Sequence, residues 1–430
     1  MSAGRIGIIG AGASGIGVAR ALRKDGLDFE VIEATKDVGG NWQPDGPASK
    51  MYRSAHLISS KKNTQFSDHP MPDDYPHYPH NSLMFKYLND VVDAADVRKA
   101  IRFGAGVLHA APEDGGWRVT LSDGEEAFYD ALVVCAGLLR KPFAPVYPGR
   151  FDGETMHAAD YRSSAALEGR RVLVVGGGNS GCDIAVDAAH VAAKVFHSTR
   201  RGYHYMPKFI AGKPTQEWLM DISPQFRGAD EYWSHVADVF KLAGFDGRDF
   251  GLPEPDHSIQ AAHPIMNSQI LYHIGHGAIA PAPDVARLDG GVVEFVDGRR
   301  ERIDVIVWAT GYGVDLPFLS GAGFDAKADL GGAFLKVLSG RYDNLIYVGY
   351  LNTPSGIGNI ANIVGKFVSK YLISKNEKSP GWIRLKSIQS SGAQIDLGQD
   401  RFMKTSRHSH EVDLWKFIKT INFISSELSK

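Results

Sequence analysis

Residues 171–201 read RVLVVGGGNSGCDIAVDAAHVAAKVFHSTRR, and this stretch decides the fold of the chain. An apolar run, Val172 to Val175, leads into a glycine-rich turn and then into a segment of small residues, Ile184 to Ala193, that predicts a helix. A strand, a G-x-G-x-x-G turn and a helix in this order predict a dinucleotide-binding unit. The free amides and positive dipole end of the helix favour a pyrophosphate there. The residues expected to line it are Gly176, Gly178, Asn179, Ser180 and Gly181.

The next predicted strand, Lys194 to Ser198, indicates which nucleotide this unit binds. It ends on Thr199, Arg200 and Arg201, where an NAD-binding unit usually carries an acid for the ribose hydroxyls. Guanidinium groups suit a 2'-phosphate, so the sequence predicts NADPH. A solvated basic turn is the alternative interpretation of the same residues.

The chain opens with a similar unit, Arg5 to Ala21, RIGIIGAGASGIGVARA. Its second strand, Phe29 to Ile32, ends on Glu33, whose carboxylate accepts hydrogen bonds from ribose hydroxyls and repels a 2'-phosphate. This unit is therefore expected to bind FAD or NAD, although Glu33 alone is also compatible with a surface acid. When the two turns are superimposed, Glu33 falls on Thr199, so one site is acidic and the other basic, as FAD plus NADPH require. The expected contacts are Gly10, Gly12, Ala13, Ser14, Gly15 and Glu33.

An internal repeat supports two units. Trp117 to Gly137 aligns without gaps on Gly291 to Gly311, and each copy has an Asp-Gly pair followed by an apolar run. Asp-Gly predicts a hairpin turn, and the apolar runs predict buried parallel strands. Each unit would thus end on its own last strand, with Gly137 or Gly311 at the carboxyl edge of the sheet, where such folds bind ligands.

Together these patterns predict an α/β protein with two Rossmann-like dinucleotide-binding domains, the NADPH domain being inserted into the FAD domain. The first part of the FAD domain would span residues 1–162, and the NADPH domain residues 163–312, with a helical insertion at about 203–277 that is rich in aromatic side chains. The second part of the FAD domain would span 313–375, and a C-terminal extension 376–430.

The predicted return to the FAD domain has three parts. Asn344 to Tyr350 reads as a buried strand, Leu351 to Asn359 as a glycine turn, and Ile360 to Leu372 as a helix whose start is aimed at a flavin ring. A plain strand–turn–helix is the alternative. After about Ser374 the pattern is polar and irregular until a final helix around Val412 to Leu428.

Composition restricts the partners. The 430 residues suggest two or three domains, and 47 basic against 49 acidic residues give a formal net charge of −2, which favours a small-molecule partner over nucleic acid or an anionic membrane. The two cysteines, Cys135 and Cys182, give no disulfide framework and no metal cluster. No apolar run reaches about 18 residues, so we expect a cytoplasmic protein without a membrane span. A homodimer stays open.

Three further motifs identify a family. A disulfide reductase would need a cysteine pair near the flavin, which leaves molecular oxygen as the common electron acceptor. Residues 151–161, FDGETMHAADY, match F-x-G-x-x-x-H-x-x-x-[YF]; residues 39–42 match G-G-x-W; and residues 309–312 match A-T-G-Y. With these motifs, which lie between Arg5 and about Tyr371, the chain resembles the flavin-containing monooxygenases, members of the class B flavoprotein monooxygenases.

The resemblance implies an activity and further site residues. It implies an enzyme that uses FAD and NADPH, forms a C4a-hydroperoxyflavin with molecular oxygen, and transfers one oxygen atom to a small soft nucleophile, an amine nitrogen or a sulfide sulfur. His157 and Tyr161 would be structural or domain-coupling residues. Further cofactor contacts would be Gly40, Asn41, Trp42, Thr310, Gly311 and Tyr312.

One position departs from the family pattern. Aligned on Lys61 and on residues 66–68, Ile58 stands where amine- and sulfide-oxygenating members commonly carry an Asn that supports the hydroperoxide. An apolar side chain cannot donate that hydrogen bond. Ser59, Ser60 and Asn63 are the candidate catalytic substitutes on this expected flavin-facing loop.

Four alternatives to this activity stay open. A Baeyer–Villiger monooxygenase favours Trp in place of Tyr161, so Tyr161 followed by Arg162 argues against it. No residue excludes an oxidative decarboxylase of indolepyruvate type. Ile58 keeps an uncoupled NADPH oxidase open, and the intact glycines of both turns argue against a redox sensor that binds both nucleotides without oxygenation.

Overall fold

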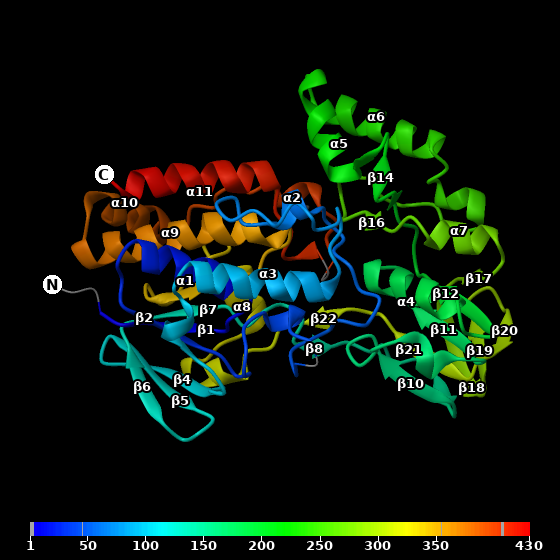
Figure 1. Cartoon of the computed structure of the whole chain (residues 1–430), viewed down its shortest axis with the longest axis horizontal. Helices are drawn as coiled ribbons and strands as arrows, with labels where there is room; N and C mark the ends of the chain where they lie inside the picture. The colour runs from blue at the N-terminus through cyan, green and yellow to red at the C-terminus, as the bar shows by residue number, and fades with distance from the viewer. Residues whose placement is uncertain (1–3, 45, 354, 406–407) are drawn as a thin grey trace. The chain divides into compact units, whose positions relative to one another are not determined.

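The structure, a computed structural model, describes residues 4–44, 46–353, 355–405 and 408–430. The described residues form two compact units, each considered by itself below (Figure 1). Unit 1 contains residues up to Ser49, then 61–140 and 314–430. Unit 2 contains residues 50–60 and 141–313.

Unit 1 is built on a five-stranded parallel sheet in the order β23-β7-β1-β2-β3. Its central strand β1 is buried along its whole length and pairs through Ile6 with Phe29 of β2 and Ala131 of β7. The strands are β1 (Ile6–Ile9), β2 (Phe29–Ile32), β3 (Ile101–Arg102), β7 (Ala131–Val134) and β23 (Leu345–Tyr347).

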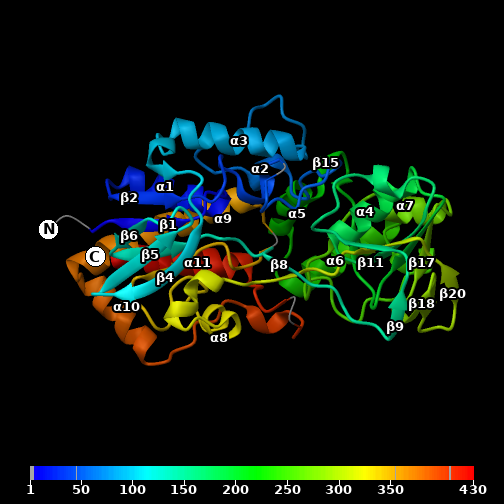
Figure 2. The ribbon, with the colours of Figure 1, turned by 90° about the horizontal axis from the view of Figure 1, so that it is seen from below.

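Helices cover this sheet. Helix α1 (Ala13–Lys24) packs against both α9 (Ile357–Glu377) and α3 (Asn81–Ala94) (Figures 1 and 2). A Cβ added at Gly17 of α1 would lie 2.6 Å from the carbonyl oxygen of Ala361, and one added at Gly365 of α9 would lie 2.4 Å from that of Gly17. The two helices therefore cross with their backbones in direct contact, which larger side chains would prevent.

Unit 2 repeats this topology with a parallel sheet in the order β10-β21-β11-β12-β17. Its apolar core lies between the sheet and α4 (Asn179–Ala189), and includes Val172, Val174 and Ile184, all fully buried. The strands are β10 (Glu154–His157), β11 (Arg171–Val175), β12 (Lys194–Ser198), β17 (Ile279–Ala282) and β21 (Val305–Trp308).

The internal repeat is confirmed in both units. In unit 1, β4 (Val107–Glu113), β5 (Gly116–Leu121) and β6 (Glu126–Tyr129) form an antiparallel sheet that leads into β7. In unit 2, β18 (Val285–Gly290), β19 (Val292–Phe295) and β20 (Arg300–Arg302) lead in the same way into β21, and β9 (Gly149–Phe151) adds a parallel edge. The paired turn glycines have matching φ angles, 87° at Gly124 and 84° at Gly298. The predicted class, two Rossmann-like α/β folds, is thus confirmed.

The insertion of unit 2, which we expected to be helical, contains three α-helices among its described residues together with short strands and loops. Its core of Met206, Val236, Phe240, Ile259 and Met266 is flanked by partly buried aromatics that include Trp218, Tyr232 and Trp233. Helices α5 and α6 are the green helices at the top of Figure 1. The elements are β13 (Tyr205–Met206), β14 (Phe209–Ile210), β15 (Lys213–Pro214), α5 (Thr215–Ile222), α6 (Ala229–Leu242), β16 (Ile265–Met266) and α7 (Ile270–Gly275).

Three local predictions need correction. Helix α4 begins at Asn179, directly after the glycine turn, and ends at Ala189, whereas the predicted span was Ile184 to Ala193. Helix α9 begins at Ile357, inside the predicted turn. The region after Ser374 is irregular only in part, because α9 continues to Glu377 and α10 (Pro380–Ser390) follows, whereas most described residues between α10 and α11 (Leu414–Leu428) lie outside helices and strands. Ser379 caps α10 by accepting a hydrogen bond from the Trp382 amide, a signal the sequence contains.

The units also differ from the predicted domain segments. Residues 50–60 and 141–162 belong to unit 2, whereas we expected them in the first domain. The reason for the second segment is β10, which pairs in register with β21 from Glu154 opposite Val305 to His157 opposite Trp308. The C-terminal residues belong to unit 1, where Phe417, Ile421 and Leu428 of α11 are buried.

Candidate functional site

The first glycine turn connects β1 to α1 with little room for side chains. Gly10 has a φ of 102°, and a Cβ added at Gly15 would lie 1.9 Å from the Gly10 carbonyl oxygen. Gly12 is the N-cap of α1 and contributes no side-chain hydrogen bond. No side chain therefore caps the N-terminal end of α1, where free helix amides favour a pyrophosphate.

A second glycine segment of unit 1 approaches this turn. Gly39 has a φ of 115° and donates its N–H to the Ala11 carbonyl at 2.9 Å. A Cβ added at Gly40 would lie 3.1 Å from the Cα of Gly12. Gly40–Trp42 forms the short 3-10 helix η1, so the structure brings Gly40, Asn41 and Trp42 next to the first turn.

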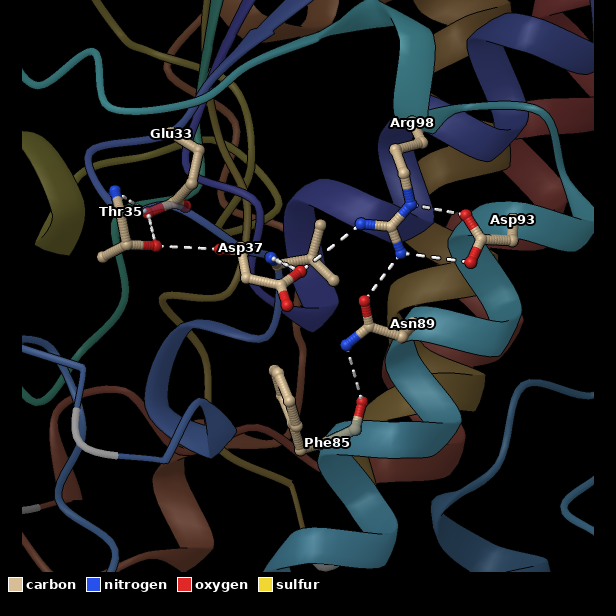
Figure 3. Close-up of polar contacts among 8 residues, drawn as sticks. Glu33, Thr35, Asp37, Phe85, Asn89, Asp93 and Arg98 are labelled. Atoms are coloured by element: carbon tan, nitrogen blue, oxygen red, sulfur yellow. Dashed lines mark hydrogen bonds and ion pairs between the residues drawn. The ribbon is translucent and has the colours of Figure 1, made fainter.

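Glu33, at the end of β2, is buried and already anchored (Figure 3). Its Oε2 accepts the Ala11 N–H at 2.7 Å, and its Oε1 accepts the Thr35 N–H at 2.9 Å. The Thr35 hydroxyl lies 2.8 Å from both Glu33 Oε1 and the Asp37 carbonyl, and its single proton can serve only one of them. Because a carboxylate has about four acceptor positions, Glu33 retains capacity for a ribose hydroxyl.

The loop that follows Glu33 is tied to α3 by an arginine. Arg98 donates from Nε to Asp93 at 2.5 Å, from Nη2 to Asn89 at 2.6 Å, and from Nη1 to Asp37 at 3.4 Å (Figure 3). Asp37 in turn accepts the Val38 amide at 2.7 Å. This network holds the backbone between Glu33 and Gly39. It therefore holds in place the Glu33 carboxylate and the Gly39 backbone, which both contact the first turn.

The second glycine turn, in unit 2, has the same geometry. Gly176 has a φ of 122°, and a Cβ added at Gly181 would lie 1.9 Å from the Gly176 carbonyl oxygen, the same distance as in the first turn. Gly178 is the N-cap of α4, with φ −75° and ψ 174° against −74° and 179° at Gly12. Ser180 is exposed at the helix start, whereas Asn179 is engaged, because its Oδ1 accepts the Met266 amide at 2.9 Å.

The strand end beside the second turn carries a different set of groups. Thr199 is buried, and its hydroxyl is a buried polar atom without a hydrogen-bond partner within the described part of the chain. Arg200 is exposed, and Arg201 pairs with Asp256 at 3.4 Å. Thr199 accordingly does not hold the turn in the way that Glu33 does.

Two residues that sequence reasoning missed support this turn instead. The Tyr203 ring lies over it, so that a Cβ added at Gly177 would be 2.3 Å from Cε2 of Tyr203. His197 is fully buried on β12, and its Nε2 lies 3.0 Å from the Gly176 carbonyl oxygen. Burial lowers the pKa of His197, so the neutral imidazole donates from Nε2. The sequence contained one signal for the role of His197. The gap-free alignment of the two units places this polar residue opposite the apolar Val31.

The A-T-G-Y motif follows β21 and lies beside the second turn. The Ala309 carbonyl oxygen would be 2.2 Å from a Cβ added at Gly176. Thr310 donates its hydroxyl to the Phe143 carbonyl, and Gly311 accepts the Phe143 amide at 3.0 Å. Tyr312 pairs with Pro142 between β22 (Tyr312–Gly313) and β8 (Lys141–Pro142). These residues therefore fix the returning chain against the nucleotide turn.

The predicted signature residues His157 and Tyr161 are both buried in unit 2. His157 Nδ1 accepts the Ala159 amide at 3.0 Å, and its ring packs edge-on against Tyr312 with centroids 5.1 Å apart. Tyr161 donates its hydroxyl to Asp187 of α4 at 2.5 Å. Their contacts join the segment 157–161 to Tyr312 and to helix α4, which agrees with the structural role that the resemblance implies.

The candidate catalytic loop is divided between the units. Ser59 and Ser60 are buried in unit 2, and the Ser60 amide donates to Gln216 Oε1 of α5 at 2.9 Å. Ile58 also belongs to unit 2, and it is 39% exposed. Asn63 lies in α2 (Lys61–Thr64) of unit 1, where a Cβ added at Gly356 would be 2.5 Å from its carbonyl oxygen. Asn63 thus adjoins the start of α9.

A partly buried acid attaches residues 50–60 to unit 2. Asp183 of α4 accepts the Tyr52 hydroxyl at 2.9 Å and the Asn267 amide at 2.5 Å. Burial raises the pKa of Asp183, and burial followed by the charge of Asp183 raises the pKa of Tyr52. The Arg53 amide also donates to the Arg162 carbonyl at 2.7 Å. These long-range contacts explain why residues 50–60 belong to unit 2, although the residues before and after them in the sequence belong to unit 1.

Lys61, on the other side of that division, organises the proline-rich loop of unit 1. Its ammonium donates to the carbonyl oxygens of Pro72 at 3.1 Å, Asp73 at 2.8 Å and Tyr75 at 2.7 Å. Its amide donates to the His77 carbonyl at 2.8 Å. The proline-rich loop, residues 67–80, is therefore held by one side chain of unit 1.

Comparison with known proteins identifies relatives of the whole arrangement. Residues 3–412 match the family described as FMO-like, flavin-binding monooxygenase-like. The dimethylaniline monooxygenase [N-oxide-forming] 2 of Pan troglodytes is 32% identical over 395 residues, which cover 85% of this chain and 72% of the relative.

Two solved structures share the fold. S-allyl-L-cysteine S-oxygenase from Allium sativum has a TM-score of 0.66 at 20% identity and covers 99% of this chain and 88% of its own. The OTEMO complex with FAD and NADP has a TM-score of 0.72 at 19% identity and covers 98% of this chain and 97% of its own. At these identities the two structures bear on the fold alone. In the described part of the chain, no helix has the length and apolarity that crossing a bilayer demands.

Proposed function

The chain belongs to the flavin-binding monooxygenase-like family and is an FAD- and NADPH-dependent monooxygenase, and from this premise we propose that it transfers one oxygen atom, by way of a C4a-hydroperoxyflavin, to a small soft nucleophile. The nucleophile is an amine nitrogen or a sulfide sulfur. The N-oxide-forming relative, 32% identical to this chain, supports an amine nitrogen, and the sulfide sulfur rests on the resemblance to the flavin-containing monooxygenases.

We assign FAD to unit 1. Its turn leads into a helix without a side-chain cap, has no side chain at Gly12, and lies beside the buried carboxylate of Glu33, which has acceptor capacity for a ribose hydroxyl. A negative carboxylate at that position disfavours a 2'-phosphate. The proposed contacts are Gly10, Gly12, Ala13, Ser14, Gly15, Glu33, Gly40, Asn41 and Trp42.

We assign NADPH to unit 2. The unsatisfied Thr199 hydroxyl and the exposed Arg200 guanidinium are the donors that a 2'-phosphate needs. Asn179 is the weakest member of the predicted set, since its side-chain oxygen already binds the Met266 amide. The proposed contacts are Gly176, Gly178, Asn179, Ser180, Gly181, Thr199, Arg200, Arg201, Thr310, Gly311 and Tyr312.

The observation that carries this proposal is the pair of equivalent turns with opposite chemistry at the adjacent strand end. One enzyme that holds both cofactors can pass hydride from NADPH to a flavin, and the reduced flavin supplies the oxygen chemistry when bound. The chain's own residues bind and orient the two nucleotides and keep water from the reacting atoms. No side chain is required as a general base for oxygen transfer to a lone pair.

The test is a stoichiometry. NADPH oxidation, oxygenated product and hydrogen peroxide are measured together with amines, sulfides, ketones and 2-oxo acids. We expect product to approach one per NADPH with an amine or a sulfide. Products from ketones or 2-oxo acids alone would instead support a Baeyer–Villiger or oxidative-decarboxylating enzyme.

A second candidate function is an uncoupled NADPH oxidase. Ile58 favours it, because this side chain cannot donate the hydrogen bond that the family's Asn supplies. Ser59, Ser60 and Asn63 are the proposed substitutes for that donor, and Asn63 is the only one of the three in the unit assigned to FAD. Peroxide equal to the NADPH consumed, with every substrate tested, would support the oxidase.

A further inference from the structure

The two arginines at the end of β12 have different surroundings. Arg200 is exposed, and no carboxylate among the described residues lies within ion-pair distance of it. Arg201 places Nη2 3.4 Å from Oδ2 of Asp256, a residue of the insertion. The arginine that we propose binds phosphate, Arg200, is thus the sequence neighbour of an arginine that faces an acid.

The acid is held in place by backbone packing. A Cβ added at Gly202 would lie 2.3 Å from both the Pro253 carbonyl oxygen and the Glu254 carbonyl carbon. The segment 253–257 therefore rests directly on the backbone that follows Arg201. His204, two residues further on, contacts the His257 carbonyl through Nε2 at 2.8 Å. The position of Asp256 is consequently a property of the fold.

The other acids nearby have a different partner. Arg248 contacts Asp246 at 2.6 Å and Glu254 at 3.0 Å, so both carboxylates have the same arginine partner within the insertion. Asp256 instead places Oδ1 2.8 Å from His257 Nδ1 and Oδ2 toward Arg201. The hydrogen bond with His257 and then the charge of Arg201 lower the pKa of Asp256, so the carboxylate is ionised at neutral pH.

We propose that Asp256 is a specificity-determining residue that competes with the 2'-phosphate of NADPH for Arg201 and thereby reduces the preference for NADPH over NADH. A fixed carboxylate beside this arginine repels a phosphate, while it can accept a hydrogen bond from the 2'-hydroxyl of NADH, as Glu33 is proposed to do for the other nucleotide. The inference rests on the proposed assignment of NADPH to unit 2.

The test compares Asp256→Asn with the unaltered enzyme. Dissociation constants for NADP+ and NAD+ are measured by calorimetry, and anaerobic reduction of the bound flavin is followed with NADPH and with NADH. We expect NADP+ to bind about three- to tenfold more tightly to the variant, because a single partly exposed charge is removed. Binding of NAD+ should stay the same or weaken. Glu254→Gln is the matched control, since Glu254 pairs with Arg248, and it should leave the ratio of the two affinities unchanged.

Each outcome is decisive. An unchanged ratio for Asp256→Asn overturns the inference, and so does a lower ratio, which would mean that Asp256 orients Arg201 toward the phosphate. Arg200→Ala separates this failure from failure of the proposed function. If Arg200→Ala weakens NADP+ while Asp256→Asn has no effect, only the role of Asp256 is wrong. If neither Arg200→Ala nor Asp256→Asn affects the binding of NADP+, the assignment of NADPH to this strand end is wrong.

Discussion

In unit 1 the strand beside the glycine turn ends on Glu33, a buried carboxylate that accepts the Ala11 amide of the turn itself. In unit 2 the equivalent strand ends on Thr199, whose buried hydroxyl has no partner within the described residues, and the exposed Arg200 follows. The backbone of the two turns is nearly identical. From this difference we propose that the turn provides the pyrophosphate site, whereas the end of the second strand selects the nucleotide.

The largest effect is expected from the third glycine of each turn. Gly15→Ala should abolish FAD binding, and Gly181→Ala should leave FAD bound and abolish NADPH binding, because either Cβ would lie 1.9 Å from a carbonyl oxygen. We expect losses above a hundredfold in the affinity of one cofactor only. Flavin absorbance and NADP+ titration measure the two sites. Gly228→Ala, in unit 2 with open space around the added Cβ, is the control. Loss of both cofactors in the Gly181 variant would break the comparison.

The selectivity of the second strand end is tested by Arg200→Ala. Removing a charge-assisted contact of roughly 1.5 to 3 kcal/mol should weaken NADPH binding about ten- to a hundredfold and affect NADH little. Affinity for both nucleotides and flavin reduction rates provide the measurement. An unaltered enzyme that binds NADH as well as NADPH would remove the contrast between the two units.

The missing amide donor of the candidate catalytic loop is tested by Ile58→Asn. If Ile58 occupies the position of the family's Asn, the new amide should lengthen the life of the oxygenated flavin, about tenfold or more, with the 2.7 to 4 kcal/mol of an oxyanion donor as an upper guide. Stopped-flow spectra of the reduced enzyme mixed with oxygen in the presence of NADP+ measure that lifetime. A long-lived species in the unaltered enzyme would mean that Ser59, Ser60, Asn63 or NADP+ already supplies the donor.

The smallest effect is expected on the pH dependence of stability, because His197 contacts the second turn and Val31 stands at the equivalent position beside the first. His197 is buried and its pKa is lowered by burial, so the unfolded state binds more protons below its ordinary pKa of about 6.5. Unit 2 should lose stability as the pH falls through that value, by at most about 1.4 kcal/mol per pH unit from this residue. His197→Val, which introduces the residue found at Val31, should show a shallower loss. Thermal unfolding at pH 7.5 and pH 5 measures it, and equal slopes for the two proteins would contradict the assigned role.

Much of the fold could be predicted because its signals are local. The apolar strands β2 and β12 have the predicted bounds, and both copies of the hairpin repeat end on the predicted glycines, Gly137 and Gly311. The assignment of residues 50–60 to unit 2 depends on the Tyr52–Asp183 hydrogen bond, which joins residues far apart in the sequence. Strand β10 was missed since Glu154 and Thr155 are exposed and give no apolar run.

The candidate site was predictable to a similar degree. The glycines, Glu33 and Thr199 lie where the alignment of the two units placed them, although their contacts with the cofactors stay predictions. The supporting groups were not predictable, because Tyr203 and Asp256 belong to an insertion whose path over the turn no periodic pattern encodes. Asn179 shows the opposite case, as a residue in the right position whose side chain is occupied by the Met266 amide.

The interleaved order of the segments has a consequence for synthesis. All five strands of the unit 2 sheet have been translated once Trp308 is made, whereas the unit 1 sheet lacks its edge strand β23 and the covering helix α9 until residues 345–377 follow. The chain begins with unit 1, yet on the ribosome the second unit can complete its sheet first. Meanwhile β7 has an open edge and α1 an uncovered glycine surface. The nascent protein is therefore most exposed to misfolding between those two points of translation, in the unit that begins the chain.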